Sequence, residues 1–118
     1  MSKFVTLEEA ISKIKDGDAV ISGGFGSLGS PEELYSGVAD RYEKEGHPKN
    51  LTFVCGITPG DKTDSTEPYK GFNIGANKMA ADGLIDRLWV GNLTDAHALA
   101  YRVDRNELAC YMPPMGFM

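Results

Sequence analysis

The 118-residue sequence predicts an α/β fold, an open and mostly parallel sheet with helices on both faces. Short apolar segments of strand length alternate along the whole chain with segments that carry helical spacing, and this order is typical of parallel sheets. Three of the four expected strands also run into a glycine or proline turn at their carboxyl ends. In open α/β sheets, ligands bind at that edge.

The first helix is expected to follow residues 6–9, which have the S/T-x-x-E form of a capping box. Residues 7–14 then carry apolar side chains at helical spacing. Gly17 suits the end of this helix because glycine readily adopts the left-handed conformation. Residues 19–22, Ala-Val-Ile-Ser, are expected to form a short buried strand.

A second capping box, Ser-Pro-Glu-Glu at residues 30–33, places Pro31 at the first position of the next helix, where its missing N–H costs nothing. Gly46 is expected to end that helix. Residues 51–55 predict a second strand that closes on Gly56. The expected apolar stripe of the helix consists of Leu34, Val38 and Tyr42.

Residues 57–73 form a polar loop that is long for a compact domain, and loops of this length are either functional or disordered. The elements beyond it are expected at residues 76–82 (a short helix), 86–91 (a strand with Trp89 in the core), 94–103 (a helix capped by Thr94) and 107–112 (a strand).

Composition argues against several functional classes. The net charge is −5 without a basic run, which disfavours nucleic-acid binding. No apolar run reaches the roughly 18 residues of a membrane span, and the first residues lack the pattern of a secretory signal, so a cytoplasmic protein is expected. Cys55 and Cys110 are too far apart for a zinc pattern and resemble small core residues. Two scattered histidines likewise predict no metal site.

The stretch "DGDAVISGGFGSLGSPEEL" concentrates glycines between an expected strand and an expected helix. A glycine-rich turn there allows main-chain N–H groups to approach a phosphate, a carboxylate or an oxyanion, and the helix N-terminus adds partial positive charge. No Gly-Lys-Ser/Thr follows, which excludes a P-loop. A G-x-G-x-x-G match exists, but the helix begins only after its third glycine, so dinucleotide binding is weakly supported. A structural turn without a ligand is the remaining alternative.

Residues 16–31, DGDAVISGGFGSLGSP, resemble the signature of family I coenzyme A transferases. The segments HPKNLTFVCG, NKMAADGLIDRLWVGNL and NELACYMPPMGFM resemble later parts of the same family in order and spacing, so the resemblance covers essentially the whole chain. It implies a Rossmann-like topology. Ser22 stands where an apolar residue is more usual. The fixed signature positions fall on Asp16, Gly17, Gly23, Gly24, Phe25, Gly29 and Pro31.

The resemblance implies that coenzyme A is moved from an acyl-CoA to a short-chain carboxylate through covalent intermediates on a glutamate. The CoA thioester is then a substrate, and no permanently bound cofactor is expected. The family carries its catalytic glutamate in the second half or in a separate subunit, and no residue of this chain matches it. Residues 1–118 are therefore expected to be a truncated, amino-terminal part of the first domain, inactive alone, dependent on a carboxy-terminal half or β subunit, and oligomeric.

Three turns carry the expected substrate-binding residues. Two alternatives remain: an acyl-CoA- or anion-binding domain without catalysis, and a sugar-phosphate isomerase-like or nucleotide-binding domain of similar sheet layout. Glu32 and Glu33 are explained by the capping box. Between Pro114 and Gly116, where some members with short acyl substrates have glutamine, this chain has Met115. The expected binding residues are Gly23, Gly24, Phe25, Gly26, Gly29, Gly56, Pro114, Met115 and Gly116, with no catalytic residue in this chain.

Overall fold

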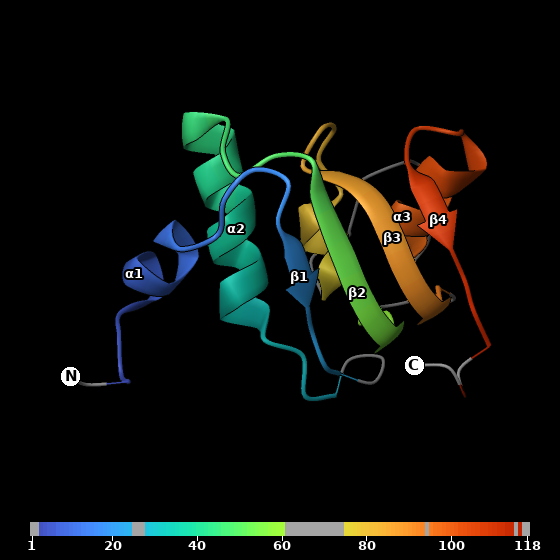
Figure 1. Cartoon of the computed structure of the whole chain (residues 1–118), viewed down its shortest axis with the longest axis horizontal. Coiled ribbons are helices and arrows are strands. Elements are labelled where there is room, and N and C mark those ends of the chain that lie inside the picture. Colours follow the sequence, from blue (N-terminus) through green and yellow to red (C-terminus); the bar gives the residue numbers. More distant parts are fainter. Residues whose placement is uncertain (1–2, 25–27, 61–74, 94, 115, 117–118) are drawn as a thin grey trace.

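A four-stranded parallel sheet in the order β1-β2-β3-β4 forms the centre of the protein in a computed structural model (Figure 1). The structure describes residues 3–24, 28–60, 75–93, 95–114 and 116. The predicted α/β class and parallel sheet are confirmed. The strands are β1 (Ala19–Ile21), β2 (Leu51–Ile57), β3 (Ile85–Asn92) and β4 (Ala109–Tyr111).

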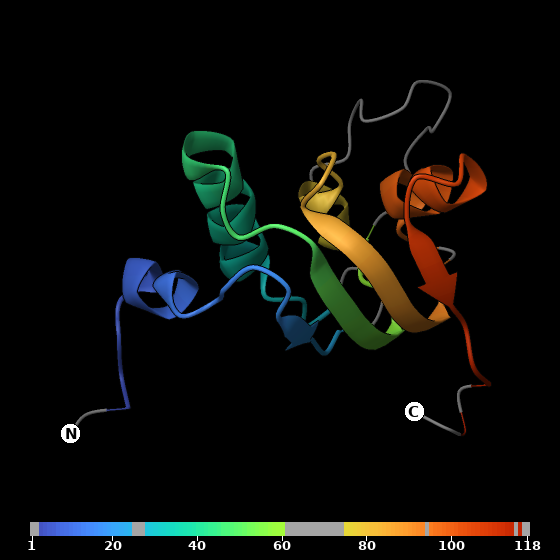
Figure 2. The same cartoon turned by 45° about the horizontal axis from the view of Figure 1, so that its top comes forward.

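The described helices that connect the strands lie on one face of the sheet, where Figure 2 shows them together above the strands. Consecutive strands are neighbours and parallel, and right-handed crossovers then return over the same face each time. The sequence alone predicts helices on both faces. Among the described residues, no helix is long and apolar enough to cross a membrane. The helices are α1 (Leu7–Ser12), α2 (Glu32–Glu45), the 3₁₀ helix η1 (Ala76–Met79) and α3 (His97–Asp104).

The face beneath the helices, here called the covered face, holds the hydrophobic core. Alternate residues of β2 are buried there, as the two-residue period of a strand requires, and β3 follows the same period from Leu88 after a register shift near Ile85. Val20 and Cys110 pack against this core from the edge strands. The buried sheet residues of this core are Leu51, Phe53, Cys55, Ile85, Leu88 and Val90.

The opposite face, here called the open face, carries an apolar row. Strand register places Ile21 beside Val54, Val54 beside Trp89, and Trp89 beside Tyr111. Trp89 is 47% exposed and Ile21 80% exposed. The predictions of a core Trp89 and a buried β1 are therefore wrong, because both side chains have the strand parity that points away from the helices. The Trp89 and Tyr111 rings meet edge to face at 5.0 Å.

The start of α2 differs from the expected capping box. Pro31 is the N-cap residue rather than the first helical residue, and no side chain caps the helix. Tyr35 and Val38 are its buried residues, whereas Leu34 is 42% exposed. The predicted end is confirmed: Gly46 adopts the left-handed conformation at φ 74° and its N–H bonds to the carbonyl of the preceding turn.

Other element boundaries also shift. The Thr6 cap of α1 is confirmed by a 3.2 Å bond from the Glu9 N–H to Thr6 Oγ1, but the helix ends at Ser12, so Gly17 does not terminate it. β2 continues through Gly56 to Ile57 instead of closing on the glycine, and the short helix after Gly75 is a 3₁₀ turn. Thr94 and most of the long loop, residues 61–74, lie outside the described residues; α3 has Ala96 as its N-cap.

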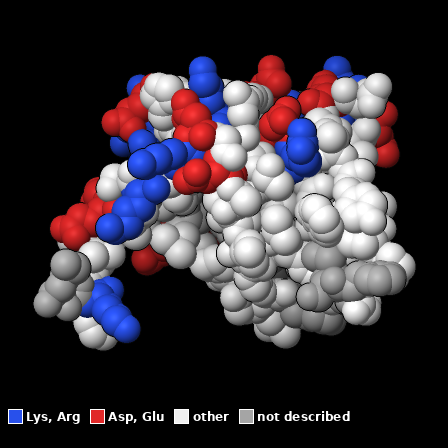
Figure 3. All heavy atoms as spheres, viewed as in Figure 1, with Lys and Arg blue, Asp and Glu red and all other residues white. Residues whose placement is uncertain are grey.

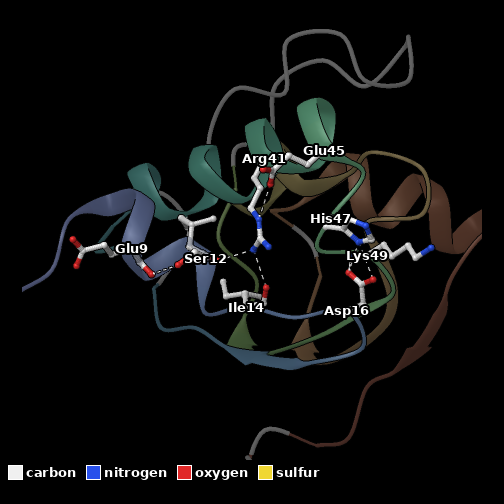
Figure 4. Close-up of polar contacts among 9 residues, drawn as sticks. Glu9, Ser12, Ile14, Asp16, Arg41, Glu45, His47 and Lys49 are labelled. Carbon is white, nitrogen blue, oxygen red and sulfur yellow. Dashed lines mark hydrogen bonds and ion pairs between the residues drawn. The ribbon is translucent and has the colours of Figure 1, made fainter.

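The amino edge of the sheet is held by a group of polar contacts (Figure 4). The Asp16 carboxylate lies 2.9 Å from His47 Nδ1 and accepts the Lys49 N–H at 3.0 Å. From α2, the Arg41 guanidinium donates to the carbonyls of Ile11 and Ile14 at 2.8 Å each, which satisfies acceptors at the end of α1. The aspartate of the signature thus fastens the turn before β1 to the turn before β2.

Candidate functional site

The glycine segment, residues 23–29, begins at the carboxyl end of β1 and leads into α2. Gly23 and Gly29 are exposed, and a side chain at either position would meet nothing within 4 Å. Phe25 and Gly26 lie outside the described residues. At Gly23 and Gly29 the segment therefore presents bare main chain to solvent at the edge where parallel sheets bind ligands, beside the exposed side chain of Leu28.

Gly24 is packed differently from Gly23. Its φ is +129°, and a Cβ there would lie 2.8 Å from Pro59 Cγ. Pro59 is fully buried at the carboxyl end of β2, and its carbonyl accepts the Ala76 N–H at 2.8 Å. Gly75 lies so close to that carbonyl that a Cβ would be 2.4 Å from the oxygen. Close main-chain packing thus joins the glycine segment to the two ends of the long loop.

A hydrogen bond beneath the glycine segment ties it to α2. Ser22 Oγ lies 2.5 Å from the hydroxyl of Tyr35, and Tyr35 is only 3% exposed. Burial raises the pKa of Tyr35, so this hydroxyl remains protonated and available as a donor at neutral pH. The serine that departs from the family signature therefore satisfies a buried phenol.

The remaining expected binding residues lie at other strands. Gly56 is inside β2, and Pro114 and Gly116 are exposed beyond β4, whereas Met115 lies outside the described residues. β1 and β4 are opposite edge strands of the sheet. With strands about 4.8 Å apart, three steps separate the two turns by roughly 14 Å. This set suits an extended ligand along the carboxyl edge better than one small group gripped from both sides.

The described side chains near this edge offer no activated thiol. Burial raises the pKa of Cys55 and of Cys110, which keeps both as neutral thiols at pH 7. Cys55 is buried as predicted, and Cys110 is partly buried against the core. Within the described ranges, no group of three or more His, Cys, Asp or Glu side chains could hold a metal ion.

Charge is unevenly spread around the site. Figure 3 shows Lys, Arg, Asp and Glu gathered over the helices and the amino edge, whereas the part of the open face toward the carboxyl ends of the strands is uncharged. The apolar row from Ile21 to Tyr111 belongs to this open face. An exposed apolar row of this kind is typical of surfaces that contact other polypeptide or ligands.

Sequence reasoning missed two residues that build this edge. The Glu32 carboxylate does not cap α2 but accepts the Gly75 N–H at 2.7 Å. Asn77 is 3% exposed, and its side-chain oxygen accepts the Ala98 N–H at 3.1 Å, which fixes the start of α3 to η1. Neither contact has a local sequence signal, because each joins residues more than 20 positions apart.

The family model and the curated proteins that this chain matches are all coenzyme A transferases. A family model described as coenzyme A transferase matches residues 4–90. Caffeate CoA-transferase of Acetobacterium woodii is 31% identical over 116 residues, which cover 98% of this chain and 20% of that protein. One of the subunits of 3-oxoadipate CoA-transferase from Acinetobacter baylyi (strain ATCC 33305 / BD413 / ADP1) is 45% identical over 49 residues, 42% of this chain and 19% of the relative. The chain thus spans about a fifth of the curated relatives it matches.

Solved structures share the fold. An acyl-CoA transferase of E. coli O157:H7 (YdiF), crystallised as a thioester complex with CoA, superposes with a TM-score of 0.77 at 22% identity, over 95% of this chain and 21% of that one. The decarboxylase AibA/AibB, crystallised as a cysteine-to-serine variant, gives a TM-score of 0.59 at 19% identity, over 92% of this chain and 37% of that one. The same sheet and crossover pattern therefore occurs within larger proteins.

Proposed function

The chain belongs to the coenzyme A transferase family, and on that premise we propose that residues 1–118 form the amino-terminal part of the first domain of an enzyme that transfers coenzyme A from an acyl-CoA to a short-chain carboxylate. One observation carries the proposal. The glycine segment follows β1 at the carboxyl edge of a parallel sheet, with Gly23 and Gly29 exposed. That edge binds ligands in open α/β sheets.

The proposed reaction proceeds on a glutamate. Its carboxylate attacks the acyl-CoA carbonyl, which forms a mixed acyl–glutamyl anhydride and releases CoA as the thiolate. The thiolate then attacks the glutamyl carbonyl, which gives the glutamyl-CoA thioester and frees the acyl group as a carboxylate. The acceptor carboxylate enters by the reverse of these two steps. Each attack creates an oxyanion, and main-chain N–H groups of the glycine segment are proposed to stabilise it.

The nucleophilic glutamate is proposed to come from further polypeptide, either a carboxy-terminal half or a β subunit. Support comes from the relatives, of which this chain matches about a fifth, and from one relative that is itself named as a subunit. The open face supplies a surface for such a partner, because the row from Ile21 to Tyr111 is apolar and the described residues visible toward the carboxyl ends of the strands are uncharged (Figure 3). We place the assembled, oligomeric enzyme in the cytoplasm.

Complementation tests the proposal. The chain is purified alone and together with a polypeptide that carries the glutamate-containing remainder of a family member. CoA exchange between acetyl-CoA and propionate is followed by mass spectrometry. The chain alone should give none, and the complemented pair should give exchange together with a partner polypeptide heavier by one CoA. Absence of both CoA binding and exchange in a stable complex would overturn the assignment.

A binding domain without catalysis is the second candidate, because no residue of this chain matches the nucleophile. Acyl-CoA binding by the complemented pair without exchange would favour it. Binding of an adenine dinucleotide in preference to CoA would instead favour a nucleotide-binding domain of similar sheet layout.

A further inference from the structure

We infer that Glu32 is a positioning residue, whose carboxylate fastens the glycine segment to the end of the long loop at Gly75. The consequence for catalysis rests on the proposed function, whereas the link itself can be tested on this chain alone. Glu32 is the first residue of α2, so it follows closely after the glycine segment in the sequence. Gly75 directly precedes η1.

Donors from three parts of the chain converge on this carboxylate. Glu32 Oε1 accepts the Ser30 hydroxyl at 2.7 Å and the Gly75 N–H at 2.7 Å. Oε2 lies 2.9 Å from Lys78 Nζ in an ion pair, and the ammonium also donates to Ser36 Oγ at 2.9 Å. Hydrogen bonds to an ionised acceptor are roughly twice as strong as neutral ones. Glu32 therefore binds Ser30, which directly follows the glycine segment, together with Gly75 at the end of the long loop and Lys78 of η1.

The Glu32 carboxylate is one of a series of contacts that connect the glycine segment and the ends of the long loop at the carboxyl edge of the sheet. From Gly75, the main chain continues to Ala76, whose N–H bonds to the carbonyl of Pro59. The Pro59 ring packs against Gly24, which lies near the start of the glycine segment, on the side away from Glu32. Two main-chain segments about 40 residues apart are thus joined at both ends, once by packing on Pro59 and once through the Glu32 side chain.

Opposing effects act on the charge of Glu32. Partial burial alone would raise its pKa, but hydrogen bonds from Lys78, Ser30 and Gly75 together hold the pKa below its usual value of 4.5. The carboxylate is therefore ionised at neutral pH and makes charge-assisted bonds. Glu33, the next residue, is exposed in the same helical turn and provides a matched comparison.

Position matters here because the proposed role of the glycine segment is to aim main-chain N–H groups. Donors that stabilise an oxyanion act only at hydrogen-bond distance, and a displacement of about 1 Å can cost about a hundredfold in rate. A glycine-rich segment has few side-chain contacts of its own to hold it in place. Glu32 instead holds Ser30 and the first turn of α2, into which the segment leads, against Gly75.

The direct test is amide hydrogen exchange of Gly75 measured by NMR on the intact chain. Glu32→Ala removes the acceptor and should accelerate exchange of the Gly75 amide by about tenfold or more. Glu33→Ala should leave that rate unchanged, and Glu32→Gln, which keeps an amide oxygen in place, should give an intermediate rate. Equal Gly75 exchange in Glu32→Ala and Glu33→Ala would overturn the inference.

A measurement on the unmutated chain covers the case in which Glu32→Ala does not fold. The Gly75 amide chemical shift should titrate in acid with a midpoint below 4.5, in step with the Glu32 carboxyl carbon. A Gly75 amide that does not follow this titration would overturn the link.

The complemented enzyme then tests the consequence. Glu32→Ala should lower kcat for CoA exchange by about tenfold or more relative to Glu33→Ala, with partial recovery in Glu32→Gln. If Gly75 exchange responds but the complemented pair neither binds CoA nor exchanges it, the link stands and the proposed function fails. If Gly75 does not respond in an active enzyme, the positioning role fails and the proposed function stands.

Discussion

Adjacent residues of β3 differ sharply in solvent exposure, because one lies on the covered face of the sheet and the other on the open face. Leu88 points beneath the helices and is fully buried, whereas Trp89 points the other way and is 47% exposed. The contrast continues across the sheet, since Phe53 in β2 is 1% exposed and Ile21 in β1 is 80% exposed. These residues are apolar on both faces, so they differ in what covers them, although the open face also carries Thr52 and Arg87 nearer the amino ends of the strands.

The difference in exposure indicates what each face of the sheet contacts. A sheet that has water on one side usually alternates apolar and polar residues. Here the open face keeps the row Ile21, Val54, Trp89 and Tyr111, with few charges nearby (Figure 3). We therefore treat the open face as a contact surface for further polypeptide and the covered face as the core that folds this chain. The predictions below test that division.

The largest effect is expected from a matched pair of substitutions in β3. Leu88→Ala opens a cavity in the core and should lower the free energy of unfolding by about 3 kcal/mol. Trp89→Ala removes a half-exposed side chain from the isolated chain and should cost less than about 1 kcal/mol. Urea denaturation of the two variants measures both. Equal losses would mean that the open face also contributes to the core of this chain.

The next effect should appear only when the partner is present. Trp89→Ala should weaken binding of the complementing polypeptide by about thirtyfold, as expected for an aromatic side chain at the centre of an interface that is worth about 2 kcal/mol. Glu43→Ala, an exposed change on the outer helix α2, is the control and should leave binding unchanged. Isothermal titration calorimetry gives both affinities. Unaltered binding by the Trp89 variant would remove the open face from the interface.

The class of the fold is predictable from the sequence, but the division between its faces is not. Alternation of helices and strands, the Thr6 cap and the Gly46 stop are local signals, and each is confirmed. β1 has only three residues, too few to reveal a period of two, and β2 reads Leu-Thr-Phe-Val-Cys-Gly-Ile, with apolar residues at both parities. In β3, Leu88, Trp89 and Val90 are consecutive apolar residues, so the pattern does not show which of them are buried, and the prediction of Trp89 in the core is wrong for that reason.

Of the candidate site, the glycine segment is predictable from the sequence, but the contacts of Glu32 are not. The glycine segment and its position after a strand follow from local sequence, because glycine has a distinct main-chain freedom. The capping box at residues 30–33 fails because Pro31 rather than Ser30 is the N-cap of α2, and the Ser30 hydroxyl instead donates to Glu32 Oε1. Gly75 and Lys78 hold the same Glu32 carboxylate from the far side. A local motif cannot report donors that arrive from the other side of a long loop.

An effect of intermediate size is expected from two glycine substitutions in the glycine segment, one at a packed position and one at an open position. Gly24 packs on the buried Pro59 with φ +129°, so Gly24→Ala should lower the free energy of unfolding by about 1 to 2 kcal/mol through strain and contact. Gly23→Ala adds a methyl group where nothing lies within 4 Å and should change stability by less than about 0.5 kcal/mol. Thermal unfolding of the two variants measures the difference. A Gly23 variant as unstable as the Gly24 variant would show that both glycines are packed.

The smallest effect concerns the amino edge, which belongs to neither face. A hydrogen bond from His47, together with the Lys49 N–H, holds the pKa of the exposed Asp16 carboxyl below its usual value of 3.8. A lowered folded-state pKa stabilises the protein above pH 3.8, and this stabilisation is lost as pH falls through the folded value. Asp16→Asn should therefore be slightly less stable than the parent at about pH 6, with the gap closing in acid. Asp86→Asn, at an exposed residue of β3, is the control. A gap that persists unchanged at about pH 2 would mean that Asp16 acts through its shape rather than its charge.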